Sequence, residues 1–263
     1  MKLHRYPDAT ETAAVQMGID AAMLATAHKD DPPTIRFYRW SKPTLSLGYF
    51  QRIADRSLHN HSRSIDVVRR ASGGGAIVHH HEWTYALVWP KPPVDAASVY
   101  RLVHGAIATA LETRGASVHM YADAPQRLVK RSKTRLVMGD HADQSDAIDG
   151  NVPDEPFLCF QRRSEFDLIC GGYKILGSAQ RRSRNALMQH GSLLMRASVH
   201  APQLPGLVEL TGRRLDESGF TDALCDAIAT AMDRRVTIVT PSSRLESHID
   251  RTKFGSPDWV VKR

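Results

Sequence analysis

Residues 166–194 read FDLICGGYKILGSAQRRSRNALMQHGSLL. The stretch contains three apolar runs, at Phe166–Cys170, Lys174–Ala179 and Ala186–Leu194, which glycine or polar residues separate. Apolar runs of this length between turn residues are typical of buried β-strands. Connections of only a few residues join antiparallel neighbours. The stretch therefore predicts three successive strands of an antiparallel sheet.

Helices and further strands are expected on both sides of this stretch. Apolar residues recur at spacings of three and four near residues 12–27 and 97–113, which predicts two amphipathic helices. Strands are expected at residues 34–40, 44–47, 65–70, 76–79 and 84–89 and near residue 118, and helices near residues 220–232 and 242–252. Runs of strands with helices before, between and after them indicate an α+β fold, with a mainly antiparallel or mixed sheet flanked by helices.

The composition is that of an ordinary globular protein. The chain has 263 residues, of which 42% are hydrophobic and 24% charged. This length suffices to bury a full core, and we expect residues 1–263 to form a single domain. Residues 123–155 carry many charges and few large apolar side chains, which predicts a long mobile loop.

Several functional classes are disfavoured by the same data. The chain has no apolar run near the ~18 residues of a membrane span, no signal-peptide pattern, and three cysteines too poorly spaced for a disulfide framework. We therefore expect a cytoplasmic protein with no membrane partner. The net charge of +7 suits either nucleic acid or an acidic protein or substrate. No nucleic-acid-binding motif accompanies the basic clusters, so we expect no nucleic acid partner.

The glycine run Gly73–Gly75, within RRASGGGAIVH at residues 69–79, is the first candidate binding site. Glycines between two strands let the backbone approach a ligand closely, and the flanking arginines supply charge for a carboxylate or phosphate. A glycine-rich hairpin turn is the competing interpretation. A Walker loop is excluded because no Gly-Lys-Ser/Thr follows, and a Rossmann fingerprint because a strand follows.

Lys174 and Cys159 are the candidates for catalysis. Lys174 lies in a strand that otherwise looks buried, where an ammonium can polarise a carbonyl or hold a phosphate. Cys159 follows the predicted loop, and a nearby ammonium would stabilise its nucleophilic thiolate. The alternatives are a solvent-facing lysine on an edge strand and an inert core cysteine.

The consecutive histidines His79, His80 and His81 suggest zinc, but side chains alternate along a strand, so the three cannot face one ion. We expect no metal site. His79 continues the glycine motif and is assigned to the same pocket. His190, in the sequence QHGS, is a second pocket histidine or a hydrogen-bonded structural one.

Taken in order, these segments resemble the lipoate-protein ligase and octanoyltransferase family, which shares its catalytic domain with biotin-protein ligases. The matching segments are residues 37–40, 44–51, 69–79, 84–86, 174–181, 189–194 and the closing SPDW at 256–259. The resemblance implies a biotin/lipoate ligase-like catalytic domain. It also implies an enzyme that transfers an octanoyl or lipoyl group to a specific lysine of a lipoyl carrier domain.

Two chemistries occur in that family. Ligases activate a free acid with ATP, whereas octanoyltransferases take the acyl group from acyl carrier protein through a cysteine thioester. The transferase is favoured because Cys159 and Lys174 stand fifteen residues apart, because Glu82–Tyr85 resembles that branch, and because His80 replaces a ligase aspartate. Gly73–Gly75 looks more like the ligase glycine run. An ATP-dependent lipoate-protein ligase acting through lipoyl-AMP, and a non-catalytic lipoyl-group binding module, remain as alternatives.

The resemblance assigns roles to individual residues. Cys159 is the nucleophile, and Lys174 holds the acyl carbonyl. The expected substrate-binding residues are Arg70, Ser72, Gly73, Gly74, Gly75, His79, Gly177, Ser178, Ala179 and His190. We expect no tightly bound cofactor, with the octanoyl or lipoyl group as substrate, and ATP with Mg²⁺ only for the ligase. The expected partners are acidic acyl carrier protein and lipoyl domains, from 2-oxoacid dehydrogenase subunits or the glycine cleavage H protein.

Overall fold

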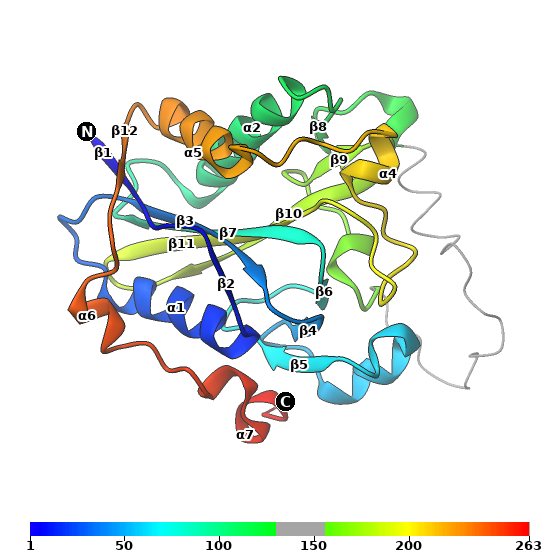
Figure 1. Ribbon diagram of the computed structural model, residues 1–263, viewed down its shortest axis with the longest axis horizontal. Coiled ribbons are helices and arrows are strands. Elements are labelled where there is room, and N and C mark those ends of the chain that lie inside the picture. The colour runs from blue at the N-terminus through cyan, green and yellow to red at the C-terminus, as the bar shows by residue number, and fades with distance from the viewer. Residues whose placement is uncertain (130–155, 263) are drawn as a thin grey trace.

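The structure is a computed structural model that describes residues 1–129 and 156–262 (Figure 1). Most of the mobile loop predicted at 123–155 lies outside these residues. Its first part, residues 123–129, forms turns and a short helical segment that begins at Gln126. Among the described residues, no helix is both long and apolar enough to cross a bilayer.

A large mixed sheet forms the centre of the described structure (Figure 1). Its strand order is β12 (Arg235–Ile238), β1 (Lys2–Arg5), β3 (Thr34–Trp40), β7 (Glu82–Pro90), β11 (Ala186–Leu194), β10 (Tyr173–Arg182), β9 (Leu168–Cys170) and β8 (His119–Met120), and β2 (Ala9–Glu11) pairs with β3. The strands from β3 to β8 pair antiparallel, and β1 pairs parallel with both neighbours. The prediction of an α+β fold with a mixed sheet flanked by helices is confirmed.

Helices cover both faces of this sheet, which explains why β11 is buried along its whole length. On one face lie α2 (Ala96–Glu112) and α5 (Phe220–Ala231), and on the other lies α1 (Ala13–Thr26) (Figure 1). The side chain of Asp95 caps α2 by accepting a hydrogen bond from the backbone N–H of Ser98. Apolar side chains of α2 and α5 pack with those of β3 and β7 in the largest core cluster.

A second, three-stranded sheet lies beside the large one and continues directly into it. Its order is β5 (Asp66–Arg69), β4 (Thr44–Leu47) and β6 (Ile77–His79), and β6 leads within three residues into β7. A parallel bridge joins Ala76 to Leu158, and the N–H of Cys159 donates to the carbonyl of Ala76 at 2.8 Å. The segment that carries Cys159 is therefore attached to the small sheet.

A buried arginine joins the small sheet to the last helical turns of the chain. Arg69 is fully buried and donates to the carbonyls of Gly48, Gln51 and Val260 at 2.6–3.0 Å. Its own carbonyl accepts from the indole N–H of Trp259 at 2.9 Å. The remaining short helices are η1 (Ile53–Leu58), η2 (Asn60–Ser62), η4 (Cys159–Gln161), α4 (Leu207–Thr211), η5 (Lys253–Gly255) and α7 (Pro257–Val260).

One predicted helix is much shorter than expected. The helix expected near residues 242–252 is limited to α6 (Ser243–Glu246). Beyond it, the carboxylate of Asp250 accepts hydrogen bonds from the backbone N–H groups of Thr252 and Lys253. Aspartate offers the backbone this local alternative to helical hydrogen bonds, so the chain turns instead of continuing the helix.

Candidate active site

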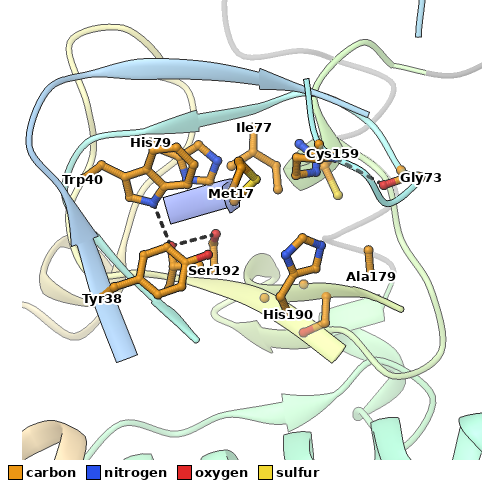
Figure 2. A pocket seen from close by; sticks show the side chains of 16 residues that line it. Met17, Tyr38, Trp40, Gly73, Ile77, His79, Cys159, Ala179, His190 and Ser192 are labelled. Carbon is orange, nitrogen blue, oxygen red and sulfur yellow. Dashed lines mark hydrogen bonds between the residues drawn. The ribbon is translucent and has the colours of Figure 1, made fainter. Parts of the chain in front are cut away.

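A pocket lies where the small sheet meets β10 and β11 (Figure 2). Nine of the twelve site residues expected from the sequence line it: Arg70, Gly73, Gly74, His79, Cys159, Gly177, Ser178, Ala179 and His190. The other three lie directly behind this lining, since Lys174 contacts Cys159, Ser72 contacts His190, and Gly75 packs against the Cys159 backbone. The structure thus brings together residues from four separate stretches of sequence.

One end of the pocket is apolar and the other carries the cysteine. Trp40 and Tyr38 lie at one end, Met17 and Ile77 between, and Cys159 beside Gly73 at the other (Figure 2). Trp40 is fixed there because its ring stacks on His79, with 3.7 Å between ring centroids, and its indole N–H donates to Thr84 at 3.0 Å. The pocket can therefore hold an apolar chain whose reactive end lies at Cys159.

Lys174 reaches Cys159 from the neighbouring strand β10. Its Nζ lies 3.7 Å from Cys159 Sγ, 3.3 Å from the Cys159 carbonyl oxygen and 2.9 Å from a carboxylate oxygen of Asp167. The side chains of Lys174 and Asp167 are each only 4% exposed. The register between β9 and β10 shifts directly after Lys174, which marks an irregularity of the sheet at this point.

The surroundings of Lys174 keep it charged. Burial lowers the pKa of Lys174, but the thiolate charge of Cys159 and the carboxylate of Asp167 outweigh burial, so the pKa is raised above its ordinary 10.5. An ammonium this close to a sulfur stabilises the thiolate, which is the nucleophilic form of cysteine. The other cysteines lack this setting, because burial raises the pKa of Cys170 and raises that of Cys225 to about 12.

The glycine run is held against the cysteine by close packing. A Cβ on Gly75 would lie 2.9 Å from the backbone nitrogen of Cys159, closer than real Cβ atoms approach, so only glycine fits there without displacement. Arg70, which is 4% exposed, donates to the carbonyls of Gly75 at 2.8 Å and Ser46 at 2.7 Å. Burial lowers the pKa of Arg70 to about 10. The buried Arg70 therefore holds the glycine run in place through these hydrogen bonds.

Each pocket histidine lies between a serine and a carboxylate. His79 Nε2 is 2.7 Å from Ser46 Oγ, and its Nδ1 is 2.6 Å from Glu82. Burial lowers the pKa of His79 more than Glu82 raises it.

His190 repeats this arrangement in the opposite wall of the pocket. Its Nε2 is 2.5 Å from Ser72 Oγ, and its Nδ1 is 3.3 Å from Asp20. Asp20 also accepts from Arg36 and Tyr38, which connects the pocket wall to α1 and β3.

Sequence reasoning did not single out several residues of this site. Met17 was indistinguishable from a core residue of its helix, and Tyr38 and Trp40 belong to a segment that carried the family resemblance without an assigned role. Asp167 gave one usable signal, since it is a carboxylate at the edge of an apolar run seven residues before a buried lysine. The further missed lining residues are Ile77, Thr84, Gly191 and Ser192.

The structure offers no metal site in the part of the chain it describes. Within residues 1–129 and 156–262, no group of three or more His, Cys, Asp or Glu side chains could hold an ion. His80 and His81 stack on each other at 3.5 Å between ring centroids and do not line this pocket.

The fold is similar to that of lipoate-protein ligases of known structure. The bipartite lipoate protein ligase from Thermoplasma acidophilum aligns with a TM-score of 0.69 at 15% identity, over 98% of this chain and 95% of that one. Lipoate-protein ligase A bound with ATP aligns with a TM-score of 0.71 at 16% identity, over 99% of each chain. These likenesses establish the fold.

The chain belongs to the lipoyl protein ligase A/B catalytic domain family, whose model matches residues 12–237. It is 29% identical to the octanoyltransferase LipM of Bacillus subtilis, over 95% of this chain and 94% of that protein. It is 26% identical to the octanoyltransferase LipM of Brevibacillus brevis, over 95% of each chain. It is 32% identical to that of Oceanobacillus iheyensis over 72% of this chain, a match that spans 62% of the relative's own length.

Proposed function

We propose that this protein is a cysteine-dependent octanoyltransferase. In this proposal Cys159 takes an octanoyl group from acyl carrier protein and passes it to the target lysine of a lipoyl domain. The observation that carries the proposal is the 3.7 Å approach of Lys174 Nζ to Cys159 Sγ at the end of an apolar pocket. The names of the relatives, all octanoyltransferases, support the same activity.

The reaction consists of two acyl transfers. The Cys159 thiolate attacks the donor thioester carbonyl, a new C–S bond forms, and the carrier thiol leaves as a thiolate that takes a proton from solvent. The free amine of the target lysine then attacks the acyl-cysteine, forms the amide, releases a proton and returns the Cys159 thiolate. Lys174 remains an ammonium throughout and stabilises the oxyanion of each tetrahedral intermediate.

The pocket selects the acyl group by apolar burial. Met17, Trp40 and Ile77 offer apolar surface to the chain. At about 0.8 kcal/mol for each methylene removed from water, some seven methylenes would contribute roughly 5–6 kcal/mol. An acyl chain of this length is therefore bound without a polar contact to its tail.

Acidic protein partners suit the surface beside the glycine loop. The exposed residues Arg181 and Arg182 end strand β10, and the exposed Arg184 lies in the turn that follows. Arg181 donates to the carbonyl of Ala71 next to the glycine loop. A basic surface accelerates encounters with acidic acyl carrier protein and with lipoyl domains of 2-oxoacid dehydrogenases or the H protein. The chemistry uses no tightly bound cofactor, and a free Cys159 thiol suits the reducing cytoplasm. We take residues 1–263 as one catalytic domain, a view that the family match over 12–237 supports.

One experiment tests the proposed function. The protein is incubated with an apo lipoyl domain and either octanoyl acyl carrier protein or free octanoate with ATP and Mg²⁺, and the lipoyl domain is weighed by mass spectrometry. Transfer from the carrier thioester without ATP is the expected result. Transfer only with octanoate and ATP would identify a ligase instead. Absence of transfer from both donors would leave a binding module.

A further inference from the structure

A second cavity, of about 300 Å³, adjoins the acyl pocket and shares Gly74 with it. We call it the outer groove. Its lining combines apolar Phe50, Leu58 and Phe157 with polar Gln51, Asp55 and Arg162. Phe50 is 70% exposed and Leu58 is 53% exposed, so two large apolar side chains face solvent beside the site. Exposed apolar surface with a polar rim, next to a reactive group, is typical of a ligand-binding surface.

The outer groove is in direct contact with the loop that packs on Cys159. A Cβ on Gly73 would lie 3.8 Å from the Phe50 ring, so this ring borders the loop. A Cβ on Gly75 would lie 2.9 Å from Arg162 Nε, and the N–H of Arg162 donates to the Cys159 carbonyl at 3.0 Å. The glycine loop and the η4 turn therefore lie between the outer groove and Cys159.

The structure of the thioester donor determines which part of it lies beside Cys159 in the outer groove. A thioester carbonyl carries two substituents, the acyl chain and the sulfur-linked arm. When the carbonyl is at Cys159 and the chain points toward Trp40, the arm has to leave past the end marked by Cys159 and Gly73 (Figure 2). The outer groove adjoins the pocket at Gly74, the next residue of this loop.

We propose that the outer groove binds the phosphopantetheine arm of the acyl donor, which is a chain of methylene and amide units that ends in a phosphate. This proposal rests on the proposed function. Phe50, Leu58 and Phe157 provide apolar surface for the methylene units, and the absence of side chains at Gly73 and Gly74 lets the arm pass close to the loop.

The charges of the outer groove agree with this ligand. Arg162 supplies a cation that favours a phosphorylated arm over a neutral one. Asp55 is the acidic residue of the lining, and its carboxylate is paired with Arg52 at 2.8 Å. The groove therefore does not present an uncompensated negative charge to the arm.

The test compares two octanoyl donors that differ only in the arm. One is octanoyl-pantetheine, and the other is octanoyl-N-acetylcysteamine, which keeps the thioester and lacks most of the arm. The measured quantity is the ratio of their kcat/KM values, with one apo lipoyl domain as acceptor. Phe50→Ala is expected to lower this ratio about tenfold, because only the longer donor reaches the groove. The matched control is Ile238→Ala, which truncates a 72% exposed residue on β12 at the far edge of the large sheet and should leave the ratio unchanged.

The outcomes separate the possible failures. An unchanged ratio of kcat/KM values in Phe50→Ala overturns the proposal. A loss of kcat/KM that appears only with the complete acyl carrier protein also overturns it, because Phe50 would then contact the protein rather than the arm. If the unsubstituted protein transfers from no thioester, the proposed function fails. The arm site is then tested by calorimetry with the unreactive amide analogue of octanoyl-pantetheine, whose affinity should fall about tenfold in Phe50→Ala. Equal affinity in both proteins would overturn the arm site alone.

Discussion

Lys174 Nζ lies 3.7 Å from Cys159 Sγ, although the two residues reach this point from different sheets. Lys174 belongs to β10 in the middle of the large sheet, whereas Cys159 belongs to a segment bridged to the small sheet beside β6. The lysine position is fixed by the ion pair with Asp167, and the cysteine position by the backbone hydrogen bond to Ala76. The proposed catalytic pair therefore depends on how the two sheets pack together.

Replacement of the nucleophile is the most direct test of that pair. Cys159→Ser should lower transfer from octanoyl acyl carrier protein by about 100-fold or more, because a serine hydroxyl is not ionised by a nearby ammonium. Intact mass spectrometry of the unsubstituted protein with donor alone should show one octanoyl adduct, absent from Cys159→Ser. The control Cys170→Ala should keep the adduct, since Cys170 does not line the pocket. Full activity in Cys159→Ser would exclude a covalent intermediate.

Asp167→Asn should change the pH dependence of the reaction. Burial lowers the pKa of Lys174, and the charge of Cys159 and the carboxylate of Asp167 both raise it, so a neutral replacement of Asp167 removes one of the two opposing contributions and the pKa falls. Activity needs the ammonium and is lost as the pH rises through this pKa. The alkaline limb of the kcat profile should therefore move to lower pH in Asp167→Asn. A lower kcat with an unmoved alkaline limb would show that Asp167 only supports the fold.

The same substitution has a predictable effect on stability. Because Lys174 and Asp167 are both buried, removing one charge should cost about 3–5 kcal/mol of unfolding free energy. The pKa of Lys174 is raised in the folded state, so its contribution to stability is complete below the unfolded pKa. It is lost only as the pH rises through the folded value. Chemical denaturation at neutral pH measures the full effect.

Gly75→Ala should displace the nucleophile. The added Cβ meets backbone atoms of Cys159 at 2.9–3.0 Å, and backbone cannot rotate away as a side chain can. The rate at which iodoacetamide alkylates Cys159 should fall, because the thiol moves away from Lys174. Gly73→Ala is the matched control, since its Cβ would meet nothing closer than 3.8 Å. Equal alkylation rates in the two variants would mean that the loop does not position Cys159.

Trp40→Phe should shift the preferred acyl length upward. Trp40 is 7% exposed at the apolar end of the pocket, and a smaller ring leaves room for additional methylenes. Each further buried methylene is worth about 0.8 kcal/mol. The decanoyl-to-octanoyl ratio of kcat/KM should therefore rise. Trp89→Phe, in the main core and outside the pocket, should be destabilising without changing that ratio.

The strands were predictable because their signal is local. Residues 34–40 alternate in polarity and are rich in aromatic side chains, and residues 186–194 are mainly apolar. The structure gives both strands with the predicted bounds. The helix near 242–252 was overestimated because the side chain of Asp250 competes for backbone N–H groups. That competition comes from one carboxylate. It does not alter the apolar periodicity from which the helix was predicted.

The site was only partly predictable because some of its residues take part only through contacts with residues of other helices and strands. Cys159, Lys174 and the glycine run carried recognisable motifs. The role of Asp167 depends on the register shift between β9 and β10, and that of Met17 on which face of α1 meets the pocket. The spacing between Asp167 and Lys174 gives a signal for the first relationship but does not establish the contact, and no residue type or spacing indicates the second.

The attachment of the Cys159 segment has a consequence for how the proposed chemistry can change. The segment joins the small sheet at the bridge between Ala76 and Leu158, and its side chains Leu158 and Phe160 are buried in the core. The side chain of Cys159, between them, is only partly buried, whereas Lys174 belongs to a ten-residue strand. A substitution of Cys159 alone can therefore remove the proposed nucleophile while the buried neighbours keep the turn, the lysine and the pocket in place.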